Sequence, residues 1–188
     1  MTDSRIISVS SENGYNYFRF EKLVGSDQLN EFDCSIIEYN EYLKREALRS
    51  QKDHIAFTWL LRSLENNAIA AYMSLIADAI KISATEKDLH RLSYPFKTIP
   101  AVKIAKLAVS SVFKERYKGI GRFMIRVASD FARTCNEQYI AARFLTVDAD
   151  IEHNADVWDF YQKNGFLVNE ELYNKNRKTI SMRRDIYC

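Results

Sequence analysis

An apolar strand, a basic segment, two glycines and an amphipathic helix follow one another between residues 101 and 135, and this run constrains the fold most. Residues 101–109 (AVKIAKLAV) carry apolar side chains on both faces, which is typical of a strand buried on both sides. Residues 119–135 repeat apolar positions every three or four residues, which predicts an amphipathic helix. A buried strand that leads into such a helix indicates a mixed α/β fold with helices packed on a sheet.

The junction between this strand and this helix has the features of a phosphate site. The first amide N–H groups of a helix lack partners within the helix, and together with the helix dipole they attract anions. Gly119 and Gly121 let a ligand approach the backbone closely. Arg116, Lys118 and Arg122 add positive charge. We expect a short basic loop here that binds a phosphate or pyrophosphate.

Other phosphate-binding motifs do not fit this junction. A P-loop needs two glycines at a longer fixed spacing, followed by Lys and then Ser or Thr, and a dinucleotide-binding loop needs a third glycine. The chain has neither pattern. A tight turn before a helix remains the alternative to a phosphate site.

The other segments predict further strands and helices, and 188 residues are enough for one domain and few for two. We therefore expect a single domain over residues 1–188, with 1–15 a polar leader and 85–98 a polar excursion. A helix competes with a strand at 68–79, which is rich in alanine. The predicted elements are strand 17–24, helix 35–50, strands 56–64, 68–79 and 101–109, helix 119–135, strand 144–147, helix 154–164, and strands 166–168 and 179–186.

Charge and cysteine content exclude several classes of protein. The net charge of +2 does not by itself require a nucleic-acid partner. Cys34, Cys135 and Cys188 form no CxxC or Cys/His pattern, so we expect neither a metal site nor a disulfide framework. Free thiols suit the reducing cytoplasm, and neither a signal peptide nor an apolar run of about 18 residues is present. We expect a cytoplasmic protein without a membrane partner.

Residues 116–121 (RYKGIG) resemble the Q/R-x-x-G-x-G/A loop of the GNAT acetyltransferases. Residues 107–109 resemble the family's central strand, and residues 154–166 (NADVWDFYQKNGF) its late helix. The resemblance implies the GNAT fold, in which helices flank a central mixed, mostly antiparallel sheet, and implies acetyl-CoA as co-substrate without a metal. The cofactor-binding residues that it implies are Leu107, Val109, Arg116, Tyr117, Lys118, Gly119, Ile120, Gly121, Arg122 and Asn154.

The first half of the chain resembles a GNAT branch that contains toxins of toxin–antitoxin pairs. Residues 32–34 match its Phe-x-Cys stretch, residues 43–47 resemble its helix, and residues 70–75 resemble its Gly-Tyr-x-x-Leu strand, with Ala71 in place of the glycine. The resemblance covers the chain from Phe32 onward. It implies an amine acceptor, with tRNA and a small antitoxin as candidate partners, and a homodimer is common in the family.

Tyr161 matches the family's tyrosine beside the thioester sulfur. A phenol with a pKa near about 10 can protonate a departing thiolate, as a general acid does. Asn154 matches the asparagine that contacts the pantetheine amides. The alternatives are a core aromatic for Tyr161 and a helix N-cap for Asn154.

The general base is not evident from the sequence. Many GNAT enzymes carry a carboxylate on the central strand, where this chain has Lys103 and Lys106. Asp148, Asp150 and Glu152 follow the next strand and could hold a water molecule, or could be loop charges. An α-amine titrates near about 8 and a lysine near about 10, so the missing carboxylate favours an α-amine as acceptor.

Three classes of function fit these observations. The first is an acetyl-CoA-dependent N-acetyltransferase acting on an aminoacyl-tRNA, with a small molecule or a protein amine as the alternative acceptor. Lys103, Lys106 and Arg143 could then meet tRNA phosphates, although alternation places the two lysines on opposite faces of the strand. The second is a non-catalytic acyl-CoA-binding module, and the third is a nucleic-acid-binding protein.

Overall fold

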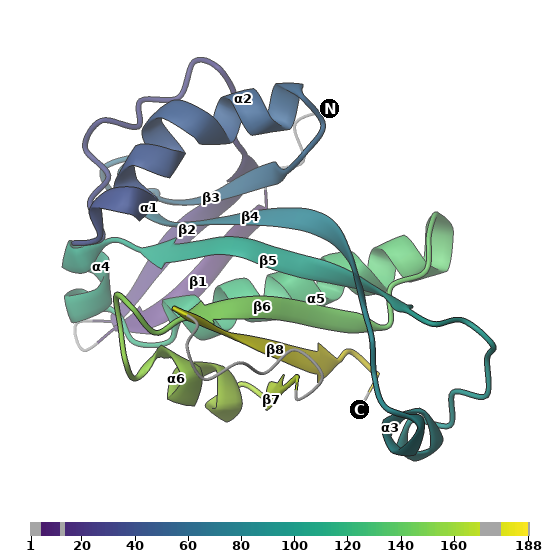
Figure 1. Cartoon of the computed structure of the whole chain (residues 1–188). Coiled ribbons are helices and arrows are strands. Elements are labelled where there is room, and N and C mark those ends of the chain that lie inside the picture. Colours follow the sequence, from purple (N-terminus) through teal and green to yellow (C-terminus); the bar gives the residue numbers. More distant parts are fainter. Residues whose placement is uncertain (1–4, 12–13, 170–177, 188) are drawn as a thin grey trace. The chain divides into compact units, whose positions relative to one another are not determined.

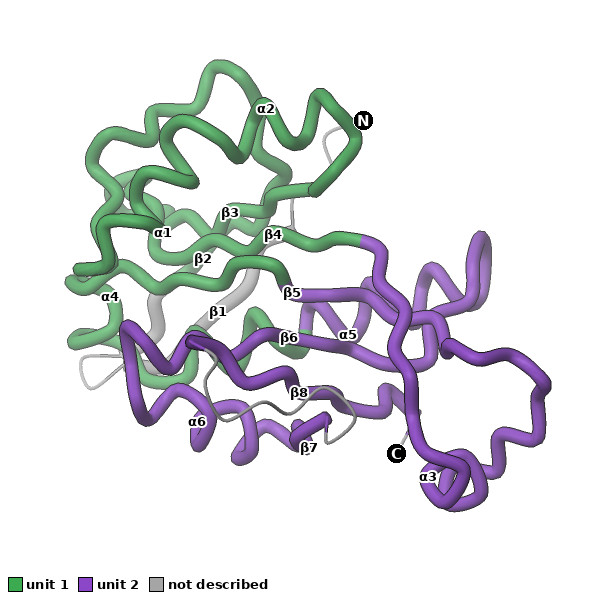
Figure 2. The backbone as a smooth tube through the Cα atoms, viewed as in Figure 1, with its two compact units in different colours: residues 1–76, 105–126 green, residues 77–104, 127–188 purple. Residues whose placement is uncertain are grey.

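The computed structural model describes residues 5–11, 14–169 and 178–187, with the residues before 17 as backbone alone. The chain divides into two compact units (Figure 2). Unit 1 comprises residues 1–76 and 105–126, and unit 2 comprises residues 77–104 and 127–188. Strands β4 and β5 and helix α5 contribute a part to each unit (Figure 1).

Unit 1 contains an antiparallel meander of strands. The strands β1 (Arg5–Ser11), β2 (Gly14–Lys22), β3 (Phe57–Ser63) and β4 (Ile69–Ile80) pair in chain order. Its helical segments are α1 (Ile37–Glu41), the π-helical turn η1 (Tyr42–Glu46), α2 (Ala47–Lys52) and α4 (Ser111–Arg116).

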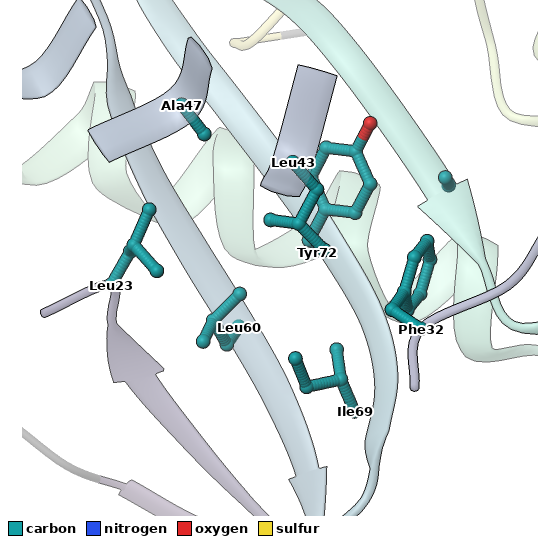
Figure 3. Packing of buried hydrophobic residues seen from close by; sticks show 8 residues of the cluster. Leu23, Phe32, Leu43, Ala47, Leu60, Ile69 and Tyr72 are labelled. Carbon is teal, nitrogen blue, oxygen red and sulfur yellow. The ribbon is translucent and has the colours of Figure 1, made fainter. Parts of the chain in front are cut away.

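The core of unit 1 lies between β3, β4 and the helical segment of residues 37–52. Leu43, Leu60 and Tyr72 are fully buried there, and Figure 3 shows Leu43 against Tyr72. The Tyr72 hydroxyl donates to the carbonyl of Tyr39 at 2.8 Å, and its ring meets the Phe32 ring edge-on at 5.3 Å. Burial raises the pKa of Tyr72 well above its usual value, so the phenol stays protonated and keeps this hydrogen bond.

A buried guanidinium in the β2–β3 pair ties two acidic side chains together. Arg62 donates to Glu21 at 2.7 Å and to Asp27 at 2.9 Å, and its side chain is only 5% exposed. Arg19 also donates to Glu21, at 2.6 Å. The pairs satisfy charges that could not otherwise be buried.

Unit 2 contains the mixed part of the sheet. β5 (Ile99–Val109) pairs parallel with β6 (Phe144–Asp150), β8 (Thr179–Asp185) pairs antiparallel with β6, and β7 (Leu167–Val168) pairs antiparallel with β8. Its helices are α3 (Ala84–Leu89) and α6 (Val157–Lys163), with the second part of α5 (Ile120–Gln138). Ile80, Ile82, Ile99, Ala101 and Phe144 form a buried cluster.

Most predicted elements are present, and several boundaries differ. The alanine-rich run at 68–79 is a strand, so the competing helix is wrong. The interpretation of residues 1–15 as a polar leader missed β1 and the start of β2, and the excursion at 85–98 contains α3. Ser83 and Glu86 form a capping box that the sequence offered and that marks the start of α3. The single domain over residues 1–188 stays a prediction.

Across the part of the chain that the structure describes, no helix is both long enough and apolar enough to cross a membrane.

The buried Arg62 pairs should matter more for stability than exposed pairs do. We expect Arg62→Met to lower the free energy of unfolding by about 3–5 kcal/mol, because Asp27 loses its cationic partner. Urea denaturation would measure the change. Arg45→Met is the control, since the Arg45 side chain is 77% exposed in its pair with Glu41 and its loss should cost below about 0.5 kcal/mol. Equal effects of the two substitutions would contradict the assignment.

Candidate functional site

The segment between β5 and α5 is a helix followed by a tight turn. The predicted basic loop is wrong in part, because residues 111–116 form α4. Two backbone bonds hold the entry to α4, from Ser110 N–H to the Ala70 carbonyl and from Ser111 N–H to the Asp33 carbonyl, both at 2.9 Å. The candidate loop itself is therefore confined to residues 117–119.

The turn before α5 depends on the left-handed backbone conformation of Gly119. Its φ is +89°, in the left-handed region that side chains rarely adopt, and a Cβ added there would have no non-neighbouring heavy atom within 4 Å. The Gly119 carbonyl accepts the Phe123 N–H at 2.9 Å as α5 begins. The N–H groups of Ile120, Gly121 and Arg122 precede that bond, so they have no partner within the helix. This 19-residue helix thus starts with the open amides that an anion site needs.

Tyr117 anchors the turn within unit 1. Its side chain is 2% exposed and meets the rings of Phe18 and Phe113 at centroid distances of 5.5 and 5.8 Å. Its N–H donates to the Phe113 carbonyl at 2.9 Å. The ring and the N–H group of Tyr117 are both engaged inside the unit, so neither is available for the predicted cofactor binding.

The cations around the turn differ in what they contact. The Arg116 guanidinium lies 5.4 Å from the centroid of the Tyr117 ring and 3.7 Å from a Glu65 carboxylate oxygen. Lys118 and Arg122 are exposed. Of the three cations predicted at this loop, Lys118 and Arg122 are therefore the most accessible to a ligand.

The end of β5 in unit 1 carries a lysine held by aromatic rings. Leu107 and Val109 are half-buried on this strand. The Lys106 ammonium lies 4.4 Å from the centroid of the Tyr39 ring and 5.9 Å from that of the Tyr42 ring. Within residues 5–11, 14–169 and 178–187, Lys106 forms no ion pair.

The two other cations considered for tRNA phosphates are neutralised in unit 2. Lys103 pairs with Asp148 at 2.5 Å. Arg143 donates to Asp185 at 2.7 Å and lies over the Tyr187 ring. Among Lys103, Lys106 and Arg143, only Lys106 lacks an anionic partner in the described part of the chain.

Tyr161 lies on α6 with its ring in an aromatic cluster of unit 2. Its side chain is 5% exposed, and the Phe160 and Phe166 rings lie 5.1 and 5.3 Å from it. The left-handed Gly165 ends α6, and the Phe166 N–H returns to the Tyr161 carbonyl at 3.0 Å. The helix end thus fixes the ring, while the catalytic role of the hydroxyl stays a prediction.

Asn154 is not the N-cap of α6. The helix begins at Val157 with Asp156 at the N-cap position, and Asn154 Oδ1 accepts the Asp156 N–H at 3.1 Å. This Asx turn explains why a helix predicted from residue 154 starts three residues later. The Asn154 amide N–H groups donate no hydrogen bond to the described residues, so they are available to a ligand.

Asp148 and Asp150 at the end of β6, and Glu152 just after it, each contact a basic side chain. Asp148 pairs with Lys103, Asp150 with His153 at 2.8 Å, and Glu152 with Lys178 at 2.6 Å. The contacts of Lys103 and Lys178 join segments that only the fold brings together, so they could not be found from the sequence, whereas Asp150 and His153 are three residues apart. The ligand atoms of Asp150, Glu152 and His153 lie within 4.8 Å of one another, but a cation there would have to replace these ion pairs.

Comparisons with known proteins reveal similarity at the level of structure. No family model and no curated protein sequence matches the chain. The structure of AtaT complexed with acetyl-methionyl-tRNAfMet matches with a TM-score of 0.71 and 19% identity, over 87% of this chain and 93% of that chain. A tyrosine-to-phenylalanine variant of KacT matches with a TM-score of 0.71 and 18% identity, over 88% and 94% of the two chains.

A third structure contains both a cofactor and a protein partner. It is a tyrosine-to-phenylalanine variant of the AtaT toxin bound to the C-terminus of the antitoxin AtaR and acetyl-CoA, with a TM-score of 0.66, 19% identity and coverage of 88% and 92%. The predicted fold, a mixed and mostly antiparallel sheet with helices, is confirmed, because the chain shares the fold of AtaT and KacT. The match to the AtaT toxin agrees with the predicted resemblance to the toxin branch in the fold alone.

The turn before α5 can be tested with one pair of substitutions. We expect Gly119→Glu to weaken acetyl-CoA binding by roughly 100-fold or more, because like charges about 4 Å apart repel by about 4 kcal/mol at an effective dielectric constant near 20. Titration calorimetry would measure the affinity. Gly119→Asn is the matched control, since asparagine tolerates the left-handed backbone and adds no charge. Normal binding by Gly119→Glu would show that the ligand phosphates lie elsewhere.

Proposed function

We propose that the chain is an N-acetyltransferase that transfers the acetyl group of acetyl-CoA to the α-amine of an aminoacyl-tRNA in the cytoplasm. The observation that carries this proposal is the start of α5, where left-handed Gly119 precedes three open amides. The fold shared with AtaT, solved with acetyl-CoA and with acetyl-methionyl-tRNAfMet, supports it. By the same likeness, a small antitoxin is the proposed protein partner.

The proposed cofactor contacts fall into two groups, according to the part of acetyl-CoA that each group would bind. The amides of Ile120, Gly121 and Arg122 suit the pyrophosphate, with the exposed Lys118 side chain adding charge. The β5 backbone at residues 107–109 and the Asn154 amide suit the amide groups of the pantetheine arm, which need hydrogen-bond partners when buried.

The proposed reaction is a direct transfer. The neutral amine attacks the thioester carbonyl, the carbon–sulfur bond breaks, and the new amide loses a proton to water. The thiolate of CoA takes a proton from the Tyr161 phenol, which regains one from water. No covalent enzyme intermediate is needed, which agrees with a Cys34 thiol whose pKa is raised by burial.

The cations favour an acceptor with phosphates. Lys106 sits on the strand segment proposed for the pantetheine arm, and the described residues leave its charge without an anionic partner. Cation–π contacts hold the ammonium without neutralising it. A phosphate of the tRNA acceptor end would supply the missing negative charge.

The Tyr161 role predicts a loss of turnover without a loss of binding. Tyr161→Phe removes the hydroxyl and keeps the ring contacts with Phe160 and Phe166. We expect acetyl transfer to fall by roughly 100-fold or more, the usual scale for a lost general acid, with little change in acetyl-CoA affinity or melting temperature. Tyr139→Phe is the control, because Tyr139 is 80% exposed. Unchanged turnover would make Tyr161 a core aromatic only.

The acceptor is tested with charged total tRNA and labelled acetyl-CoA. We expect label in the tRNA fraction that mild base releases together with the amino acid. Growth arrest on expression, relieved by Tyr161→Phe, would agree with a toxin. Efficient labelling of free polyamines or peptides with none on tRNA would favour the alternative acceptors. Cofactor binding with no transfer to any amine would favour the non-catalytic module.

Two lysine variants sharpen the same assay. Lys106→Met should raise the KM for aminoacyl-tRNA by roughly tenfold, the scale of one lost charged contact of about 1.5 kcal/mol. Lys103→Met should change it less, since Lys103 already pairs with Asp148. An equal effect of both variants would show that Lys106 does not contact the acceptor.

A further inference from the structure

The connection between β4 and β5, residues 81–98, presents unusual side chains for an exposed segment. This β4–β5 excursion lies in unit 2 and projects from the strands together with α3 (Figures 1 and 2). The Tyr94 and Phe96 side chains are 60% and 64% exposed, and Pro95 stands between them. Leu89 is exposed as well. Exposed apolar side chains that are grouped together, unlike single scattered ones, mark interaction sites.

One ion pair and one histidine–carboxylate contact hold this excursion to β8. Glu86 at the start of α3 pairs with Arg183, and His90 at its end pairs with Asp185 at 2.8 Å. Arg183 and Asp185 are two residues apart on β8, so one face of that strand receives both ends of the helix. The His90 ring also meets the Phe144 ring edge-on at 5.3 Å.

A hydrogen bond also connects the segment that carries Tyr94 and Phe96 to α3. Lys87 Nζ donates to the Phe96 carbonyl at 2.9 Å, which ties the extended run around Pro95 back to α3. This bond restricts the backbone beside Phe96, which reduces the entropy lost when a partner binds there.

The excursion also carries a net positive charge. Residues 81–98 contain four basic and two acidic residues, which is a net charge of +2, the same as that of the entire chain. Glu86 is engaged with the buried Arg183, so its charge does not offset the basic residues. The basic residues are Lys81, Lys87, Arg91 and Lys97, and all but Lys87 are exposed.

We propose that the β4–β5 excursion binds single-stranded nucleic acid, with bases stacked on Tyr94 and Phe96 and phosphates at Arg91 and Lys97. Aromatic side chains interleaved with cations are the combination that unpaired strands require, since every base has a flat face and every nucleotide a charge. A duplex hides its base faces and cannot stack in this way. An acidic peptide would use the cations and leave the rings exposed.

The proposal stands on the excursion itself and does not depend on acetyl transfer. Under the proposed function, the unpaired 3′ end of a tRNA provides such a strand. The excursion would then contribute affinity for the RNA part of the acceptor, separately from the chemistry at the amine.

The test uses the full-length protein and a fluorescent single-stranded RNA of about 12 nucleotides, a length within the range that such surfaces occupy. We expect the double variant Tyr94→Ser, Phe96→Ser to bind the RNA at least tenfold more weakly in fluorescence anisotropy, because each stacked base contributes about 1–3 kcal/mol. Tyr139→Ser is the matched control, since Tyr139 is an exposed tyrosine of the same unit outside the excursion. Circular dichroism would show that all variants fold alike.

Two further measurements make the outcome specific. Lys97→Gln should lower the slope of log affinity against log salt by about 0.7, the value for one phosphate contact on a single strand. The same sequence annealed to its complement should bind more weakly than the single strand. Equal affinity of the double variant and the wild type, or equal loss in Tyr139→Ser, would overturn the proposal, as would a preference for the duplex or for an acidic peptide.

The experiment also separates this surface from the proposed enzyme activity. RNA binding that requires Tyr94 and Phe96, with no label on charged tRNA, would leave the surface standing and remove the proposed function. Equal labelling of tRNA by the wild type and the double variant, with unchanged RNA affinity, would remove the proposed surface and leave the proposed function standing.

Discussion

The left-handed backbone at Gly119 is the constraint on which the proposed cofactor site depends. Two buried side chains, Tyr117 and Ile120, fix the chain on either side of the exposed Lys118 and Gly119. Between these anchors the backbone must reverse from α4 into α5, and a positive φ accomplishes this without a side-chain clash. The open amides of α5 therefore face outward because the flanking residues are held in the core of unit 1.

Electrostatic pairing decides which charged groups are available to a ligand. Arg143 and Lys103 satisfy carboxylates of their own unit, and Asp150 and Glu152 contact basic side chains as well. An exposed pair contributes little to stability, yet it removes both charges from competition for a substrate. Lys106 differs because aromatic rings hold its ammonium while leaving its charge in place.

Periodicity made β5 and α5 predictable, because a doubly buried strand and an amphipathic helix each leave a pattern in the sequence. The capping box of Ser83 and Glu86 is a local signal from which the start of α3 is predictable. The start of α6 was misplaced because Asn154 favours a helix cap and an Asx turn equally. Ion pairs such as Arg62 with Asp27 could not be predicted, since they join segments whose register only the folded chain defines.

A lysine in place of a central-strand carboxylate changes which amines the proposed enzyme can accept. A carboxylate would raise the pKa of a bound amine while helping to remove its proton, whereas a nearby ammonium lowers that pKa by repelling a second positive charge. An α-amine titrates near about 8 and needs a small shift to be largely neutral at pH 7, but a lysine side chain near about 10 needs a shift of several units. In the proposed enzyme, a Lys106 ammonium near the acceptor would therefore favour α-amines over lysine side chains, and an α-amine would not require a general base to deprotonate it.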